Sequence, residues 1–410
     1  MQDLIPLYPL YQLLFEDHGL SPTEISTLFI IWSATAFLLE IPSGALADVF
    51  SRRKLLMLGP ALTGLGYAAW ITLPSYVSFA AGFVLWGAGS ALISGTYEAF
   101  VYDELAARGS TAKYANLLGK ARSAALIANL TATLAAIPLF AVGGYALAGA
   151  VSLLSCLAQL LVAASLPEAT RAVAADETAP ENLGSSPGEA VAGAGGPSSL
   201  PAPTPPTRGW RGALERYVFM LRAGLGEAAT SRVVRRAVGL VALLGGFLAF
   251  DEYFPLLARG VGASNTLVPL LIAVTVAAQA IGGALAGPAY RLPASVFAVG
   301  LGATAGLISW GSLSGTALGF VPIALGYGVM QLVIVVSEAR LQDAIEGPAR
   351  ATVTSVSGFF AEVFAVSVYA GFALGAVWFS LPILVAGLTV PVLLTALVTP
   401  KALPPPPQES

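Results

Sequence analysis

Residues 40–54 read Glu-Ile-Pro-Ser-Gly-Ala-Leu-Ala-Asp-Val-Phe-Ser-Arg-Arg-Lys. They close an apolar segment, about 24–49, that is long enough to span a membrane as a helix, which takes ~20 residues. The segment ends in one carboxylate, Asp48, and three cations follow at Arg52, Arg53 and Lys54. A charge at the end of a spanning helix is costly and marks function, and clustered cations mark the cytoplasmic side. This stretch therefore predicts a helix that ends at the inner membrane surface.

The composition is that of an integral membrane protein. Of the 410 residues, 56% are hydrophobic and only 10% are charged, against about 25% charged in soluble domains. Long apolar segments, rather than short alternating ones, indicate helices and not a barrel. A nucleotide-driven pump is disfavoured because the chain has no Gly-x-x-x-x-Gly-Lys-Ser/Thr motif. With one cysteine, Cys156, we expect no disulfide framework, and one histidine cannot make a metal site. We also expect no cofactor, no enzymatic activity and no nucleic-acid partner.

Twelve apolar segments are candidate membrane helices. They lie at about 4–17, 24–49, 54–74, 76–104, 114–142, 145–166, 234–256, 265–287, 293–312, 315–340, 350–375 and 378–399. The first has only about fifteen residues before Glu16, or roughly 22 Å of helix against a ~30 Å hydrocarbon core. We expect that the true start lies upstream; the alternative is a partial first helix.

The segments divide the chain into two bundles. The predicted parts are an amino-terminal six-helix bundle (1–167), a linker (168–209), an amphipathic interfacial helix (210–232), a carboxy-terminal six-helix bundle (233–400) and a tail (401–410). The linker is rich in Ala, Pro, Gly, Ser and Glu, a composition that cannot bury a core, so we expect disorder. Trp210, Leu214 and Tyr217 recur at helical spacing with arginines between them, which favours a helix on the inner membrane surface over a simple extension of the next span.

The cations fix the expected orientation. Of the 20 lysines and arginines, all but Arg259 fall in cytoplasmic segments or at cytoplasmic helix ends when both termini are placed inside. We therefore expect a multi-pass protein of the plasma membrane, in particular a bacterial inner membrane, acting as a monomer.

The two bundles repeat each other. Gly44-Ala-Leu-Ala47 recurs as Gly283-Ala-Leu-Ala286 at an offset of 239 residues. Glu98-Ala99 with Asp103 recurs as Glu338-Ala339 with Asp343 at an offset of 240. Two matches at nearly the same offset indicate an internal duplication.

The run 40–54 resembles the loop between helices 2 and 3 of major facilitator superfamily (MFS) transporters, in the subgroup with Glu-x-Pro-Ser-Gly-x-x-Ala-Asp. Val49 and Ser51 depart from the family pattern, which has a basic residue and a glycine there. The resemblance implies an all-α, 12-helix fold with two pseudo-symmetric bundles. It also implies a gating latch formed by Gly44, Asp48, Arg52 and Arg53; the alternative is that the cations only set topology.

Two intramembrane carboxylates are candidates for proton coupling. Glu40 lies eight residues before Asp48, about 12 Å deeper in the membrane, and Glu362 lies near the middle of its segment. Intramembrane carboxylates are expensive and mark ion or substrate paths, although a protonated acid bonded between helices is the alternative. Asp251 and Glu252 stand nearer the outer end of their segment, where we expect solvation.

Two further groups of candidates follow. Ion pairs at the cytoplasmic helix ends are expected from Glu98, Asp103, Arg122, Glu338 and Asp343, with Arg340 and Arg350 near Glu338. Cavity-lining residues, implied by the resemblance, are Tyr8, Tyr11, Trp86, Phe250, Tyr253, Tyr327 and Gln331.

The predicted function is a secondary transporter that exports an apolar or cationic small molecule in exchange for protons. An acidic, aromatic interior with few cations disfavours anionic substrates. The antiporter signatures of helices 4 and 5 are missing, so a proton-coupled uptake symporter stays open, as does a non-transporting membrane scaffold or sensor.

Overall fold

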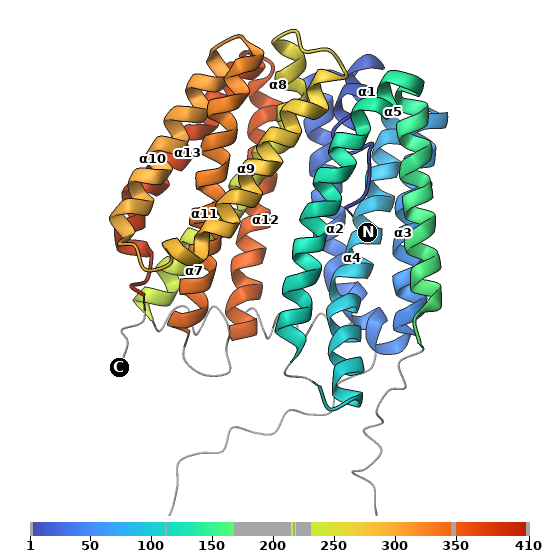
Figure 1. The fold of residues 1–410 in the computed structure, drawn as a ribbon, viewed down its shortest axis with the longest axis horizontal. Coiled ribbons are helices and arrows are strands. Elements are labelled where there is room, and N and C mark those ends of the chain that lie inside the picture. Colours follow the sequence, from blue (N-terminus) through green and yellow to red (C-terminus); the bar gives the residue numbers. More distant parts are fainter. Residues whose placement is uncertain are drawn as a thin grey trace, which may run out of the picture.

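The computed structural model describes residues 3–110, 113–167, 215, 218, 231–345 and 350–406. Within these ranges every regular element is helical (Figure 1). The predicted linker and almost all of the predicted amphipathic helix lie outside the described residues. We refer to residues 3–167 as the amino-terminal half and to residues 231–406 as the carboxy-terminal half.

The amino-terminal half contains five labelled helices. They are α1 (Tyr11–Asp17), α2 (Pro22–Val49), α3 (Arg52–Thr72), α4 (Tyr76–Ala107) and α5 (Tyr114–Ser165). The start of α2 is fixed locally by a capping box, in which the Ser21 hydroxyl accepts from the Glu24 amide at 3.3 Å. The Glu24 carboxylate in return accepts from the Ser21 amide at 2.8 Å, and Pro22 occupies the first turn.

The long helix α5 is two membrane crossings. Gly143 and Gly144 have non-helical backbone angles, and Gly144 has a φ of 58°, which favours glycine. The chain reverses there and returns, as predicted for segments 114–142 and 145–166.

The carboxy-terminal half contains the remaining elements. They are α7 (Arg232–Gly246), the 3₁₀ helix η2 (Phe247–Tyr253), α8 (Phe254–Gly260), α9 (Leu267–Ala289), α10 (Ala294–Leu313), the 3₁₀ helix η3 (Ala317–Gly319), α11 (Phe320–Ala344), α12 (Arg350–Gly375) and α13 (Leu381–Ala402). The sequence predicts one helix over 234–256, whereas the structure interrupts it with η2. A 3₁₀ stretch inside a spanning helix often marks a functional hinge.

Ten helical stretches of the described chain are long and apolar enough to cross a membrane. One of them is Leu117–Ser165, which the Gly143–Gly144 turn divides into two crossings. The short α1 is not among the ten, so the predicted first segment, 4–17, forms a helix only over its second half.

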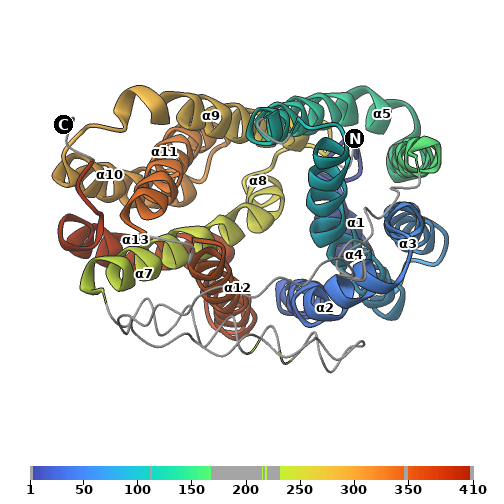
Figure 2. The ribbon, with the colours of Figure 1, turned by 90° about the horizontal axis from the view of Figure 1, so that it is seen from below.

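The helices pack through small residues within each half. A side chain on Gly66 of α3 would place its Cβ 2.8 Å from the carbonyl oxygen of Gly82 in α4, so this close approach needs glycine. Between the halves, α2 packs on α12 and α5 packs on α9. Figure 2 shows the two groups of helices side by side, with α2 next to α12.

The halves are tied together at the end where α1 and α8 lie. There the Tyr253 hydroxyl donates to the Ser26 hydroxyl at 2.9 Å, and Arg259 forms ion pairs with Glu16 and Asp17. We call this the closed end, and we call the end at which α2 and α5 finish and α7 begins the linker end. In Figure 1 the two groups of ribbons diverge toward the linker end.

Candidate functional site

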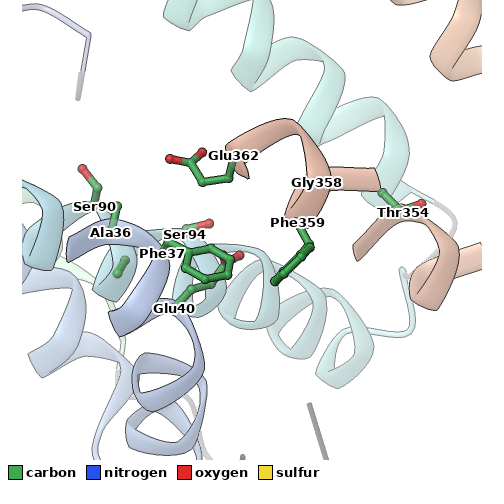
Figure 3. Close-up of a pocket in the computed structure, with 10 residues that line it drawn as sticks. Ala36, Phe37, Glu40, Ser90, Ser94, Thr354, Gly358, Phe359 and Glu362 are labelled. Carbon is green, nitrogen blue, oxygen red and sulfur yellow. The ribbon is translucent and has the colours of Figure 1, made fainter. Parts of the chain in front are cut away.

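A cavity of about 510 Å³ lies between the halves and takes its walls from α2, α4 and α12. We call it the outer cavity. Glu40 of α2 and Glu362 of α12 both line it, together with Ser90 and Ser94 of α4 (Figure 3). The two carboxylates predicted from the sequence, which come from opposite halves, are therefore brought to the same space.

Glu362 also lines a second cavity, of about 270 Å³, which we call the middle cavity. Ala36 and Glu362 belong to both linings, so the two spaces adjoin at these residues. The Glu362 carboxylate accepts a hydrogen bond from the hydroxyl of Ser33, one turn of α2 before Ala36. The side chain of Glu362 thus stands at the boundary of two cavities and is bonded to the other half.

A third cavity, of about 110 Å³, continues this series, and we call it the inner cavity. Asp251 and Glu252 of η2 line both the middle and the inner cavity. Four acidic side chains therefore follow one another along the interface between the halves: Glu40, then Glu362, then the neighbouring Asp251 and Glu252.

The expectation that Asp251 and Glu252 are solvated is wrong for Glu252, which is only 5% exposed. Its carboxylate accepts hydrogen bonds from Tyr8 Oη at 3.2 Å, from Tyr11 Oη, and from Gln12 Nε2 at 3.0 Å. All three donors come from the other half. The sequence places Glu252 near a helix end, but the irregular η2 turns it into the interface, and no periodicity signals that turn.

The three cavities are lined by acidic and neutral polar side chains together with apolar ones. No lysine or arginine is found among the described residues that line the outer, middle and inner cavities. The site therefore suits neutral or cationic species and disfavours anions.

The predicted cavity aromatics mostly pack instead of lining a cavity. Tyr8 lines the inner cavity and meets Trp86 edge-on, with ring centroids 6.0 Å apart. Tyr253 stacks on Phe372, and Tyr327 donates to the carbonyl oxygen of Leu248 at 2.7 Å. The side chains of Tyr11 and Phe250 are buried in the core, and Gln331 is partly buried on α11.

At the linker end the structure places Arg52 against Asp103. The Arg52 guanidinium forms an ion pair with Asp103 and donates to the carbonyl oxygen of Ala99 at 3.0 Å, which joins α3 to α4 within one half. Glu98 lines a further cavity of about 540 Å³ among α3, α4 and α5, which shares Ser94 with the outer cavity. The side chains of Asp48 and Arg122 and the surroundings of Gly44 lie outside the described part of the structure, so the predicted latch stays a prediction.

In the described part of the carboxy-terminal half, the residue that corresponds to Asp103 makes a hydrogen bond instead of an ion pair with an arginine. Asp343, which corresponds to Asp103, accepts a hydrogen bond from Tyr290 Oη. Partial burial and the neighbouring Asp343 carboxylate raise the pKa of Tyr290 to about 12. Arg340, expected near Glu338, is buried and donates to the carbonyl oxygens of Tyr290, Leu292 and Pro404.

A family model described as Major Facilitator Superfamily matches residues 4–366. The chain belongs to the major facilitator superfamily. It is thus a membrane transporter and not an enzyme. No curated protein sequence matches it.

Solved structures of MFS transporters share its fold. A bacterial homologue of the human lysosomal transporter Spinster, inward-facing and unoccupied, is 16% identical with a TM-score of 0.61; the match covers 98% of this chain and 92% of that one. A mutant of the nucleoside transporter NupG is 10% identical, with a TM-score of 0.64 and 97% of both chains covered. A D-xylose-proton symporter is 15% identical, with a TM-score of 0.57 and coverages of 98% and 94%. At these identities the likeness establishes the fold alone.

Two hydrogen-bond donors to the carboxylates of this MFS chain, Gln12 and Ser33, were not predicted from the sequence. Tyr8, Tyr11 and Gln12 stand at positions i, i+3 and i+4, a spacing that places all three on one face of a helix. This polar face could have indicated a buried hydrogen-bond acceptor. Ser33 carries no comparable signal, because a lone serine in a spanning helix usually bonds within its own helix.

Proposed function

We propose that this MFS transporter is a secondary transporter that exports an apolar or cationic small molecule in exchange for protons, and that Glu362 carries the proton. The observation that supports this most is the position of Glu362, at the boundary of the outer and middle cavities and in contact with Ser33 of the other half. A carboxyl that two cavities reach can take up a proton from one and release it to the other.

The contact with Ser33 offers a way to couple the proton to movement of the halves. A carboxylate accepts a stronger hydrogen bond than a neutral carboxylic acid does. Protonation of Glu362 therefore weakens its bond to Ser33 and favours separation of α12 from α2. In this scheme Glu40 exchanges protons between Glu362 and the linker end, because it lines the same outer cavity.

The conformation supports alternating access with the linker end facing the cytoplasm. Contacts such as Tyr253–Ser26 and Arg259–Asp17 join the halves at the closed end, while the outer cavity lies nearer the linker end. We propose that the protein is a monomer in a bacterial inner membrane with both termini inside. Residues 40–48 support its placement in the Glu-x-Pro-Ser-Gly-x-x-Ala-Asp subgroup.

The direction of coupling is tested in proteoliposomes with ethidium, an apolar monovalent cation, as the probe. Exchange predicts that an acidic lumen drives ethidium into the vesicles, because protons leave as ethidium enters. Accumulation that instead requires an alkaline lumen would identify an uptake symporter. Equal ethidium movement in protein-free vesicles would remove the support for transport of this probe.

A further inference from the structure

The inner cavity has features that the proton-exchange scheme does not use. It is lined by residues of both halves, including Gln12 and Asn129 from the amino-terminal half and Asp251, Glu252 and Thr275 from the carboxy-terminal half. Its volume of about 110 Å³ is well below the roughly 300 Å³ at which small-molecule pockets begin, but it can hold an ion with a few waters.

One buried oxygen atom of a residue that lines this cavity lacks a partner. Gln12 is 1% exposed, and its Nε2 is committed to Glu252 at 3.0 Å. Its Oε1 is buried and has no hydrogen-bond partner among the described residues. A buried acceptor left unpaired costs about 1–3 kcal/mol, so an occupant that bonds to it is favoured.

The charges point to a cation as that occupant. Glu252 accepts hydrogen bonds from three neutral donors, and Asp251 is its neighbour in sequence, so two acidic groups share this buried site. No lysine or arginine lies among the described lining residues, and Arg259 of α8 forms its ion pair with Asp17 at the closed end. A buried carboxylate stays charged only when a positive charge is paired with it and otherwise takes up a proton, so a bound cation and a proton are the two occupants that the test must distinguish.

The donor atoms define the class of cation. Carboxylate, amide and hydroxyl oxygens suit hard cations, and the Thr275 hydroxyl donates to the carbonyl oxygen of Ile272 at 2.8 Å, which leaves its lone pairs available. The described residues that line the inner cavity include no histidine or cysteine, so the ligands that transition metals prefer are missing there. Two adjacent carboxyl groups in one buried site do not both stay charged, and the single negative charge that is left suits a monovalent ion.

We propose that the inner cavity binds Na⁺ through Asp251, Glu252, the Gln12 Oε1 and the Thr275 hydroxyl. Because these ligands come from both halves, the bound ion stabilises the closed end. The lining of the inner cavity does not include Glu362, which carries the proton in the proposed exchange. Binding of Na⁺ to the inner cavity can be measured without a transport assay.

The test is thermal unfolding of the purified full chain in detergent, at fixed pH, with NaCl replacing choline chloride at constant ionic strength. Na⁺ should raise Tm saturably by at least about 2 °C. Asp251→Asn and Thr275→Val should each raise the half-saturating Na⁺ concentration at least about tenfold, the effect of losing one ligand worth about 1.4 kcal/mol.

Thr395→Val is the matched control, because the Thr395 hydroxyl donates to the carbonyl oxygen of Pro391 in its own helix at 2.8 Å and lines none of the three cavities. It should keep the response to Na⁺. Binding of ²²Na⁺ to the wild-type chain, displaced by unlabelled Na⁺, gives a second readout that needs no variant. The proposal is overturned if the wild type neither binds ²²Na⁺ nor responds to Na⁺, if both cavity variants respond like wild type, or if K⁺ or Ca²⁺ replaces Na⁺ equally well. A Tm that depends on pH and not on Na⁺ would assign a proton to the cavity instead.

Discussion

The Ser33 hydroxyl donates a hydrogen bond to the Glu362 carboxylate, and this contact joins α2 of one half to α12 of the other. Glu362 lines the outer and the middle cavity at the same time. A carboxyl group in that position can take up a proton from either cavity, and its hydrogen bond breaks when the two halves separate. In the proposed mechanism, this contact couples protonation of Glu362 to movement of the two halves.

Removing the Ser33 hydroxyl should loosen the coupling between protons and substrate. A hydrogen bond to a charged group contributes about 1.5–3 kcal/mol, so Ser33→Ala should let protons cross without substrate. We expect ethidium moved per proton to fall at least about twofold, measured with a lumenal pH dye alongside ethidium fluorescence. Ser367→Ala is the control, because the Ser367 hydroxyl bonds to Val363 in its own helix. An unchanged ratio in Ser33→Ala would show that this hydrogen bond does not couple the two movements.

The ion pair between Arg52 and Asp103 should contribute modestly to stability. Its side chains are 22% and 44% exposed, so solvent screens the pair and a coupling free energy of at most about 1 kcal/mol is expected. A double-mutant cycle with Arg52→Gln and Asp103→Asn, followed by chemical unfolding, measures it. The pair Arg108–Glu104, within one helix and with Arg108 66% exposed, should give a smaller value. The reverse ranking would contradict the role assigned to Arg52 in joining α3 to α4.

Arg340 should be far more sensitive to substitution than Arg52. It is 1% exposed, donates to the carbonyl oxygens of Tyr290, Leu292 and Pro404, and lies over the rings of Tyr290 and Phe297. Arg340→Met leaves those carbonyls without their donors, at about 1–3 kcal/mol each, and should lower Tm sharply or prevent folding.

Arg340→Lys should rescue only part of this loss, because an ammonium group cannot reproduce the planar fork of the guanidinium. Full recovery of Tm in the lysine variant would mean that charge alone is needed at this position.

Deleting residues 170–205 distinguishes the transporter hypothesis from the hypothesis of a non-transporting scaffold. If the chain acts by alternating access of its two halves, the shortened linker should leave ethidium transport within about twofold of wild type, since longer or shorter loops change closure free energy little. A scaffold that binds a partner through the linker predicts loss of function. The measurement is ethidium flux at matched protein content, with surface expression checked in both chains.

Much of the fold is predictable from the sequence, because membrane helices need long apolar segments and leave the pattern visible. The reversal at Gly143–Gly144 and the repeat of Asp103 at Asp343 both follow from residues that can be read directly. Glu40 and Glu362 are identifiable as intramembrane carboxylates, and the structure brings them to one cavity.

The inner part of the site is not predictable in the same way. Glu252 is buried because η2 breaks the helix, and a 3₁₀ segment has no distinct hydrophobic period. Its partners Tyr8, Tyr11 and Gln12 lie about 240 residues away in sequence and reach it only through the packing of one half on the other. Such pairings depend on tertiary contacts that a single sequence does not encode locally.

The most direct test of proton coupling is ethidium transport by Glu362→Gln in proteoliposomes with an imposed pH gradient. The account predicts that accumulation driven by an acidic lumen falls at least about tenfold, a loss of about 1.4 kcal/mol or more. Exchange of ethidium for ethidium at equal pH should persist, which would show that the variant is folded and binds the probe. If Glu362→Gln instead accumulates ethidium like wild type at every pH, Glu362 does not carry the proton.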